Sequence, residues 1–170
     1  MIFINKYLFI INIMDDIQLL CDDILVYILN LITTKELIKF SQINKYFMNF
    51  FKRNIKWFKI DCAYSAITDK GLEYLKNVHT IDLRGCNQIT DKGLEYLKGV
   101  HTIYLAKCNQ ITDKGLEYLK GVHTINLYSC KQITDRGLEY LKSVHTIDLT
   151  DCNQITDKGL EYLKGAKIYK

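Results

Sequence analysis

The chain has 170 residues, of which 48% are hydrophobic and 25% are charged, and its formal net charge is +4. This composition is typical of one or two small packed domains and excludes an intrinsically disordered or collagen-like chain. The basic residues form no continuous block, so the charge gives no indication of nucleic-acid binding.

Residues 1–14 form an apolar tail for which the sequence allows several interpretations. The tail is shorter than the roughly 20 residues that span a bilayer, and it lacks the small-residue cleavage site of a secretory signal. Met14 stands directly before two aspartates and could be the real start, in which case residues 1–13 would be an upstream artefact. A membrane anchor over residues 2–13 is a further alternative.

Residues 20–57 carry three short helical patterns. Apolar residues at helical spacing follow the acidic pair Asp22-Asp23 and predict a first helix. A capping box at residues 33–36 predicts a second helix over residues 34–42, and a third helix with an aromatic side is expected to begin near Asn44. Three helices of this size bury little surface, so we expect the unit to dock on the rest of the chain, on another protein, or on both.

The same segment resembles an F-box. The matching strings are Leu20-Cys21-Asp22-Asp23-Ile24-Leu25, Ile28-Leu29, Lys35-Glu36-Leu37 and Ile43-Asn44-Lys45-Tyr46-Phe47, with Cys21 where the family usually has a proline. The resemblance implies docking on the Skp-family adaptor of a cullin-RING ubiquitin ligase. It assigns the adaptor contacts to Leu20, Cys21, Ile24, Ile28, Leu37, Ile43 and Phe47. Ile28 and Phe47 could equally belong to the small core of the unit.

From residue 67 onward the chain repeats a unit of 22 residues. The unit first reads ITDKGLEYLKNVHTIDLRGCNQ and returns with few changes at residues 89, 111 and 133 and, cut short, at residue 155. Apolar and polar residues alternate over Val78–Leu83, which predicts a strand buried on one face. A helix of about eight residues is expected to start at Thr68 and Asp69 and to end at Asn77 or at its later equivalents Gly99, Gly121 and Gly165.

A strand and a short helix cannot bury an apolar face until a neighbouring unit stacks on them, so the repetition predicts a solenoid with one parallel sheet. The phrase Val78-x-x-Ile81-x-Leu83-x-x-Cys86 resembles the cysteine-containing leucine-rich repeats over residues 67–170, with a weaker first strand at residues 58–62. The expected fold is therefore α/β: a leucine-rich-repeat solenoid (parallel sheet plus short helices) preceded by a small all-α three-helix F-box-like unit. The expected boundaries are 1–14 for the tail, 15–57 for the F-box-like unit and 58–170 for the solenoid.

Several residue types recur in columns, one residue per unit. The cysteine column is Cys86, Cys108, Cys130 and Cys152, and the histidine column is His79, His101, His123 and His145. We expect free, buried thiols packed near backbone groups at a tight turn, although the coil spacing would also permit a disulfide. Each histidine lies seven residues before its cysteine, outside the usual spacing of zinc ligands, so no metal or cofactor is expected.

A column of aspartates runs beside a column of basic residues and is expected to form a solvated convex face of compensating charge. Its members are Asp69, Asp91, Asp113, Asp135 and Asp157, beside Lys70, Lys92, Lys114, Arg136 and Lys158.

Differences between the units gather at outward strand positions and in the residues just after each strand. Because side chains alternate along a strand, these positions are expected on the exposed, concave face of the sheet. The predicted partner-binding residues are Asp82, Arg84, Tyr104, Lys107, Asn126, Tyr128, Asp148 and Asp151, with the two tyrosines as anchors. The alternative is that variation gathers wherever packing permits it.

The sequence contains no catalytic constellation, so we expect no enzyme. The two resemblances together imply the substrate-recognition subunit of a cullin-RING (SCF-type) ubiquitin ligase that binds an adaptor and a target protein, without nucleic acid or membrane. The alternative is a non-catalytic interaction scaffold or decoy. The chain also resembles repeat proteins of large DNA viruses, which implies a cytoplasmic or nuclear location in a eukaryotic host cell. A last coil that stops at Ile168 and Tyr169 without a cap could mediate dimerisation.

Overall fold

The structure is a computed structural model that describes residue 49 and residues 53–170. Outside the described residues lie the apolar tail and all seven expected adaptor contacts. The first two expected helices and most of the third lie there as well. The described part begins with a short 3-10 helix, η2 (Ile55–Trp57), which leads directly into the first strand.

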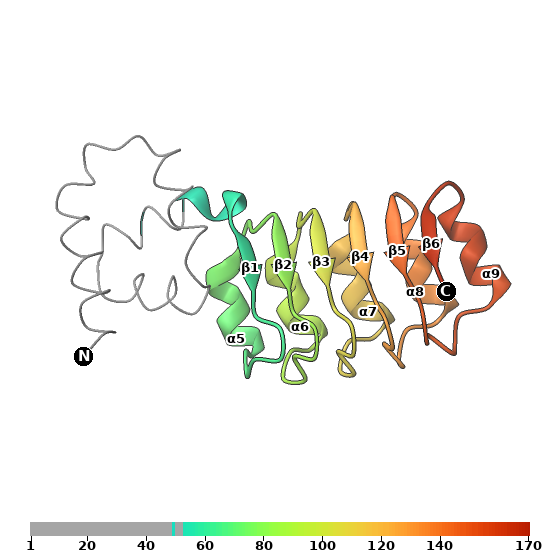
Figure 1. Cartoon of the computed structure of the whole chain (residues 1–170), viewed down its shortest axis with the longest axis horizontal. Helices are drawn as coiled ribbons and strands as arrows, with labels where there is room; N and C mark the ends of the chain where they lie inside the picture. The colour runs from blue at the N-terminus through green and yellow to red at the C-terminus, as the bar shows by residue number, and fades with distance from the viewer. Residues whose placement is uncertain (1–48, 50–52) are drawn as a thin grey trace, which may run out of the picture.

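Six parallel strands form one sheet, in which each strand pairs with the next along the chain (Figure 1). The strands are β1 (Lys59–Asp61), β2 (Thr80–Asp82), β3 (Thr102–Tyr104), β4 (Thr124–Asn126), β5 (Thr146–Asp148) and β6 (Lys167–Tyr169). Their register places identical residues opposite one another, for example Ile81 with Ile103 and Ile103 with Ile125. The sheet therefore follows from the repeat period, and the predicted solenoid is confirmed.

Each connection between strands carries a short helical segment on the same side of the sheet (Figure 1). The α-helices are α5 (Asp69–Leu72), α6 (Asp91–Leu94), α7 (Asp113–Leu116), α8 (Asp135–Leu138) and α9 (Asp157–Leu160). Each continues as a 3-10 helix: η3 (Glu73–Leu75), η4 (Glu95–Leu97), η5 (Glu117–Leu119), η6 (Glu139–Leu141) and η7 (Glu161–Leu163). The expected single helix is thus one α-turn followed by one 3-10 turn, a tightening that is common where a helix ends.

The start and the end of these segments follow the predicted signals. The hydroxyl of Thr112 accepts the backbone N–H of Lys114 and caps the start of α7. After the 3-10 turns, Asn77, Gly99 and Gly121 have φ values of 68°, 84° and 87°, which is the left-handed conformation that ends a helix.

The hydrophobic core runs through all coils because every unit contributes the same residues. In the unit around β3 the core residues are at most 3% exposed: Val100, Ile103, Leu105, Cys108, Ile111, Leu116 and Leu119. Equivalent side chains of neighbouring units form one continuous cluster. A coil therefore buries its apolar side only against its neighbours, as the stacking argument predicts.

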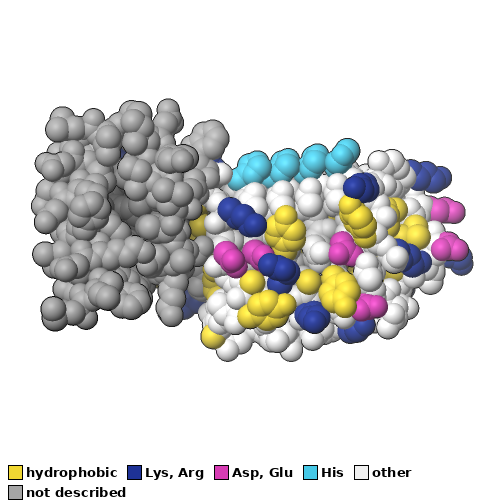
Figure 2. All heavy atoms as spheres, viewed as in Figure 1, with side chains coloured by type: hydrophobic (Ala, Val, Ile, Leu, Met, Phe, Trp, Pro, Cys, Tyr) yellow, Lys and Arg dark blue, Asp and Glu magenta, His cyan; other side chains and the backbone are white. Residues whose placement is uncertain are grey.

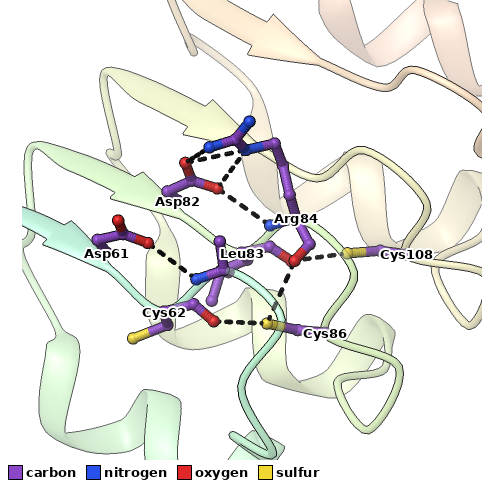
Figure 3. Close-up of polar contacts among 8 residues, drawn as sticks. Asp61, Cys62, Asp82, Leu83, Arg84, Cys86 and Cys108 are labelled. Atoms are coloured by element: carbon purple, nitrogen blue, oxygen red, sulfur yellow. Dashed lines mark hydrogen bonds and ion pairs between the residues drawn. The ribbon is translucent and has the colours of Figure 1, made fainter. Parts of the chain in front are cut away.

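The cysteine column is buried, and its thiols are free, as expected. Each thiol donates a hydrogen bond to a backbone carbonyl of the preceding coil: Cys86 to Cys62 at 3.0 Å, and Cys108 to Leu83 at 3.1 Å (Figure 3). Burial raises the pKa of Cys108 and of Cys130 to about 12. These thiols are therefore protonated, poorly reactive members of the core.

The aspartate column has a different role from the expected one. Asp91 accepts two hydrogen bonds from Thr112 of the next coil, one from the backbone N–H at 2.8 Å and one from the hydroxyl at 2.6 Å. The same pair of bonds recurs between Asp69 and Thr90, Asp113 and Thr134, and Asp135 and Thr156. The prediction of a merely solvated charge column is wrong for these aspartates, because stacking places each carboxylate at the helix start of the following coil.

The aspartates also explain the glycine that follows each of these threonines. A Cβ atom on Gly115 would lie 2.4 Å from Asp91 Oδ1 and 3.0 Å from Leu94 Cδ1. Glycine is therefore required for close approach rather than for backbone freedom. A different set of lysines, each just after a 3-10 segment, pairs with the glutamate that begins that segment, as Lys98 does with Glu95 at 3.4 Å.

Candidate partner-binding face of the sheet

The face of the sheet that points away from helices α5–α9 carries the candidate site. We call it the open sheet face and define it by Lys59, Asp82, Arg84, Tyr104, Lys107, Asn126, Tyr128, Asp148 and Asp151. Figure 2 views this side and shows apolar and aromatic side chains between cationic and anionic ones, with the histidines in a row along one rim.

The structure brings the eight predicted residues onto this face, but with unequal exposure. Arg84, Lys107 and Asp151 are exposed, whereas Tyr104, Asn126, Tyr128 and Asp148 are half-buried. Asp82 is only 3% exposed. A partner on this face would therefore meet Arg84 rather than Asp82.

Arg84 covers Asp82 through a set of hydrogen bonds (Figure 3). Its Nε donates to both carboxylate oxygens at 2.9 and 3.0 Å, and its Nη2 donates to Oδ2 at 2.6 Å. Burial by itself raises the pKa of Asp82, but the hydrogen bonds and the charge of Arg84 outweigh this effect and hold the pKa below the usual 3.8. Asp82 is thus an ionised group that fixes the guanidinium in place.

The strand position of Asp82 also shapes the following turn, a role that the sequence analysis missed. Asp82 accepts the backbone N–H of Arg84 at 3.1 Å, Asn126 that of Tyr128 at 3.0 Å, and Asp148 that of Thr150 at 3.0 Å. Asp and Asn side chains commonly accept a hydrogen bond from the backbone two residues on. The available signal was that this position is Asp or Asn in every strand except those of Tyr104 and Tyr169.

The two expected tyrosine anchors each lie beside a lysine. Lys59 Nζ lies 5.8 Å from the ring centroid of Tyr104, and Lys107 Nζ lies 5.8 Å from that of Tyr128. A hydrogen bond with Asp151 raises the pKa of Tyr128, which therefore stays a neutral phenol at physiological pH. Lys59 was not among the predicted residues. The signal for it was that the equivalent position is threonine in each of the strands β2–β5.

The turns after the strands hold non-glycine residues in the left-handed conformation. Lys107, Ser129 and Asp151 have φ values of 61°, 59° and 62°, and Gly85 stands at the equivalent position with 69°. A non-glycine residue in this conformation costs about 1–2 kcal/mol.

The described residues were also searched for larger metal-ligand clusters and for membrane-spanning helices. Residues 49 and 53–170 contain no group of three or more His, Cys, Asp or Glu side chains that could hold one metal ion. Within the same residues, no helix is long and apolar enough to cross a membrane.

Comparison with known families finds two matches. The F-box domain family matches residues 17–59, and the Leucine Rich repeat family matches residues 74–98, 101–120 and 140–164. These matches confirm both resemblances seen in the sequence. A search of curated proteins found no match.

Among solved structures, the fold is similar to that of a chain in the crystal structure of the Rad7 and Elc1 complex in yeast, with a TM-score of 0.54 and 17% sequence identity. The similarity covers 65% of this chain and 31% of the yeast chain. At this identity, the similarity concerns the fold alone.

Proposed function

We propose that this chain, which matches the F-box domain and Leucine Rich repeat families, is the substrate-recognition subunit of a cullin-RING (SCF-type) ubiquitin ligase. The two domains support an adaptor type of role, and proteins with this pair of domains are typically not catalytic. In this proposal the F-box docks on a Skp-family adaptor, and the open sheet face holds a target protein. A cytoplasmic or nuclear location is part of the proposal, and a viral origin stays a prediction.

The observation that carries the proposal is the direct succession of the two domains. The F-box match ends at residue 59, and β1 begins at Lys59. The solenoid therefore starts without a linker, which is the arrangement needed to hold a target at a fixed distance from the adaptor. We propose the domain division at residues 15–57 and 58–170 on the same grounds.

The open sheet face supports the second half of the proposal. Its polar groups are already oriented by one another, as with Arg84 on Asp82 and with Asn126 Nδ2, which donates to Asp148 Oδ2 at 2.8 Å. A surface that is ordered before binding loses less conformational entropy on association. Half-buried tyrosines next to exposed charges have the composition of interaction hot spots.

Affinity capture with a Skp-family adaptor tests the proposal. The full chain should capture the adaptor, and Ile24→Asp should abolish capture because it places a charge on the expected adaptor side. Two controls should leave capture unchanged: Lys70→Glu at an exposed position of helix α5, and Tyr104→Ala with Tyr128→Ala on the open sheet face. Capture that is absent, or equal for the parent and Ile24→Asp, would contradict the adaptor assignment.

Reconstitution with cullin, RING protein and ubiquitin separates a substrate receptor from a scaffold or decoy. A receptor should support ubiquitin transfer to a captured target, and this transfer should require both Ile24 and the two tyrosines. If the adaptor binds but no captured protein is modified, the scaffold or decoy alternative is favoured instead.

A further inference from the structure

All four histidines of the chain lie in one exposed row. Each histidine directly precedes the first threonine of a strand from β2 to β5, and the row follows one rim of the open sheet face (Figure 2). The ring centroids of successive histidines are 4.5, 4.5 and 4.7 Å apart, with interplanar angles of 16°, 11° and 24°. The parallel sheet thus stacks four imidazoles from four different coils.

One nitrogen of the rings has a nearby hydrogen-bond partner. Nδ1 of His79, His101 and His123 lies 3.4, 3.2 and 3.2 Å from the hydroxyl of the following threonine. Metal-binding histidines usually donate the N–H of one ring nitrogen to an oxygen, which fixes the ring and leaves the other nitrogen for the metal. The threonine hydroxyls provide such an oxygen for His79, His101 and His123, and in the tautomer that carries its proton on Nδ1 the Nε2 atom is free to bind a metal.

The spacing of the row limits which histidines can share an ion. Two imidazole nitrogens at metal–nitrogen distances of about 2.1 Å can be at most about 4.2 Å apart. The ring centroids of neighbouring histidines are 4.5 Å apart, so turning two exposed rings out of the stack until their Nε2 atoms point at a common ion brings these atoms within the limit. The rings of histidines that lie two coils apart, such as His79 and His123, are separated by much more than this distance. Each ion would therefore take two protein ligands, in line with the absence of a three-ligand group among the described residues.

We propose that adjacent pairs in the histidine row bind a divalent transition-metal ion of the imidazole-preferring class, such as Ni²⁺, Cu²⁺ or Zn²⁺. Water completes the coordination of the ion, because the row is exposed and each pair supplies two nitrogens. Imidazole is a ligand that suits these metals, whereas Mg²⁺ and Ca²⁺ prefer oxygen.

The buried thiols do not compete for the ion, because burial raises the pKa of Cys108 and Cys130 to about 12.

Two double variants of the full chain test the proposal, and both retain two histidines. His79→Ala with His101→Ala keeps the adjacent pair His123 and His145, whereas His101→Ala with His145→Ala keeps His79 and His123, which are not adjacent. Titration calorimetry with Ni²⁺ should show that the adjacent variant keeps the binding of the parent site, and that the separated variant binds at least tenfold more weakly. The mirrored variants, which keep His79 with His101 or His101 with His145, should give the same contrast.

Electron paramagnetic resonance with substoichiometric Cu²⁺ gives an independent readout. The adjacent variants should show coupling to nitrogens of two imidazoles, and the separated variants to only one. Equal affinity of adjacent and separated variants, no measurable binding by the parent, or a single imidazole in the adjacent variants would overturn the proposal. Thermal denaturation followed by circular dichroism verifies that all four variants are folded as the parent is.

Discussion

Gly115→Ala tests the inter-coil contact of the aspartate column. The new Cβ would lie 2.4 Å from Asp91 Oδ1, so the carboxylate must move away from Thr112, whose backbone N–H and hydroxyl it accepts. Hydrogen bonds to charged groups contribute about 1.5–3 kcal/mol each when buried, and partial exposure reduces the pair to about 2 kcal/mol in total. Because alanine has a higher helix propensity than glycine, the substitution also stabilises the folded protein by about 1 kcal/mol. We expect a net loss of about 1 kcal/mol.

Gly71→Ala is the matched control at the same position of the first helix. Its Cβ would meet only the side chain of Ile67, at 2.8 Å, and no aspartate. The higher helix propensity of alanine therefore offsets the cost of moving Ile67, and Gly71→Ala should leave the free energy of unfolding unchanged or raise it slightly. Urea denaturation of both variants and the parent measures the difference, which we expect to be about 1–2 kcal/mol.

A double-mutant cycle shows whether Asp91 is the cause. Once Asp91→Ala has removed the carboxylate, adding Gly115→Ala should cost little or should stabilise, so the two effects should be strongly non-additive. If Gly115→Ala is as stable as Gly71→Ala, or if the effects of Asp91→Ala and Gly115→Ala simply add, the assignment of this column to inter-coil contacts is wrong.

Three further outcomes are expected. Ser129→Gly should raise the stability against urea by about 1 kcal/mol, because Ser129 has a left-handed φ of 59°; an unchanged midpoint would contradict this. Arg84→Ala should raise the pKa of Asp82. The stability from ionised Asp82 is present above about pH 4 and is lost as the pH falls through its folded pKa, so this loss should move to higher pH in the variant; a carboxyl titration by NMR that matches the parent would refute the role of Arg84. Deletion of residues 111–132 should leave a folded solenoid with one coil fewer, because every coil interface is alike; loss of cooperative unfolding in circular dichroism would contradict it.

The repeat made most of the solenoid predictable from the sequence. A period of 22 residues places Ile81, Ile103 and Ile125 in register, and this register determines the sheet and the core without knowledge of longer-range contacts. The buried positions of the free thiols followed from the same argument, whereas the exposure of the histidine row was not predicted. The F-box resemblance was confirmed by comparison, whereas its helices and adaptor contacts lie outside the described residues.

The polar contacts between coils were less predictable. Asp91 and Thr112 are 21 residues apart, and a list of charges cannot show that a carboxylate reaches the helix start of the next coil. The burial of Asp82 likewise depends on the rotamer of Arg84, which covers it. Within one unit, sequence pattern indicates which face a side chain occupies, but the partner of a polar group depends on the three-dimensional stacking of the coils.

The affinity of the full chain for a Skp-family adaptor is the most direct test of the proposed function. Titration calorimetry should give measurable binding for the parent, binding at least tenfold weaker for Ile24→Asp, and unchanged binding for Tyr104→Ala with Tyr128→Ala. No binding by the parent, or the same affinity for the parent and Ile24→Asp, would contradict the account.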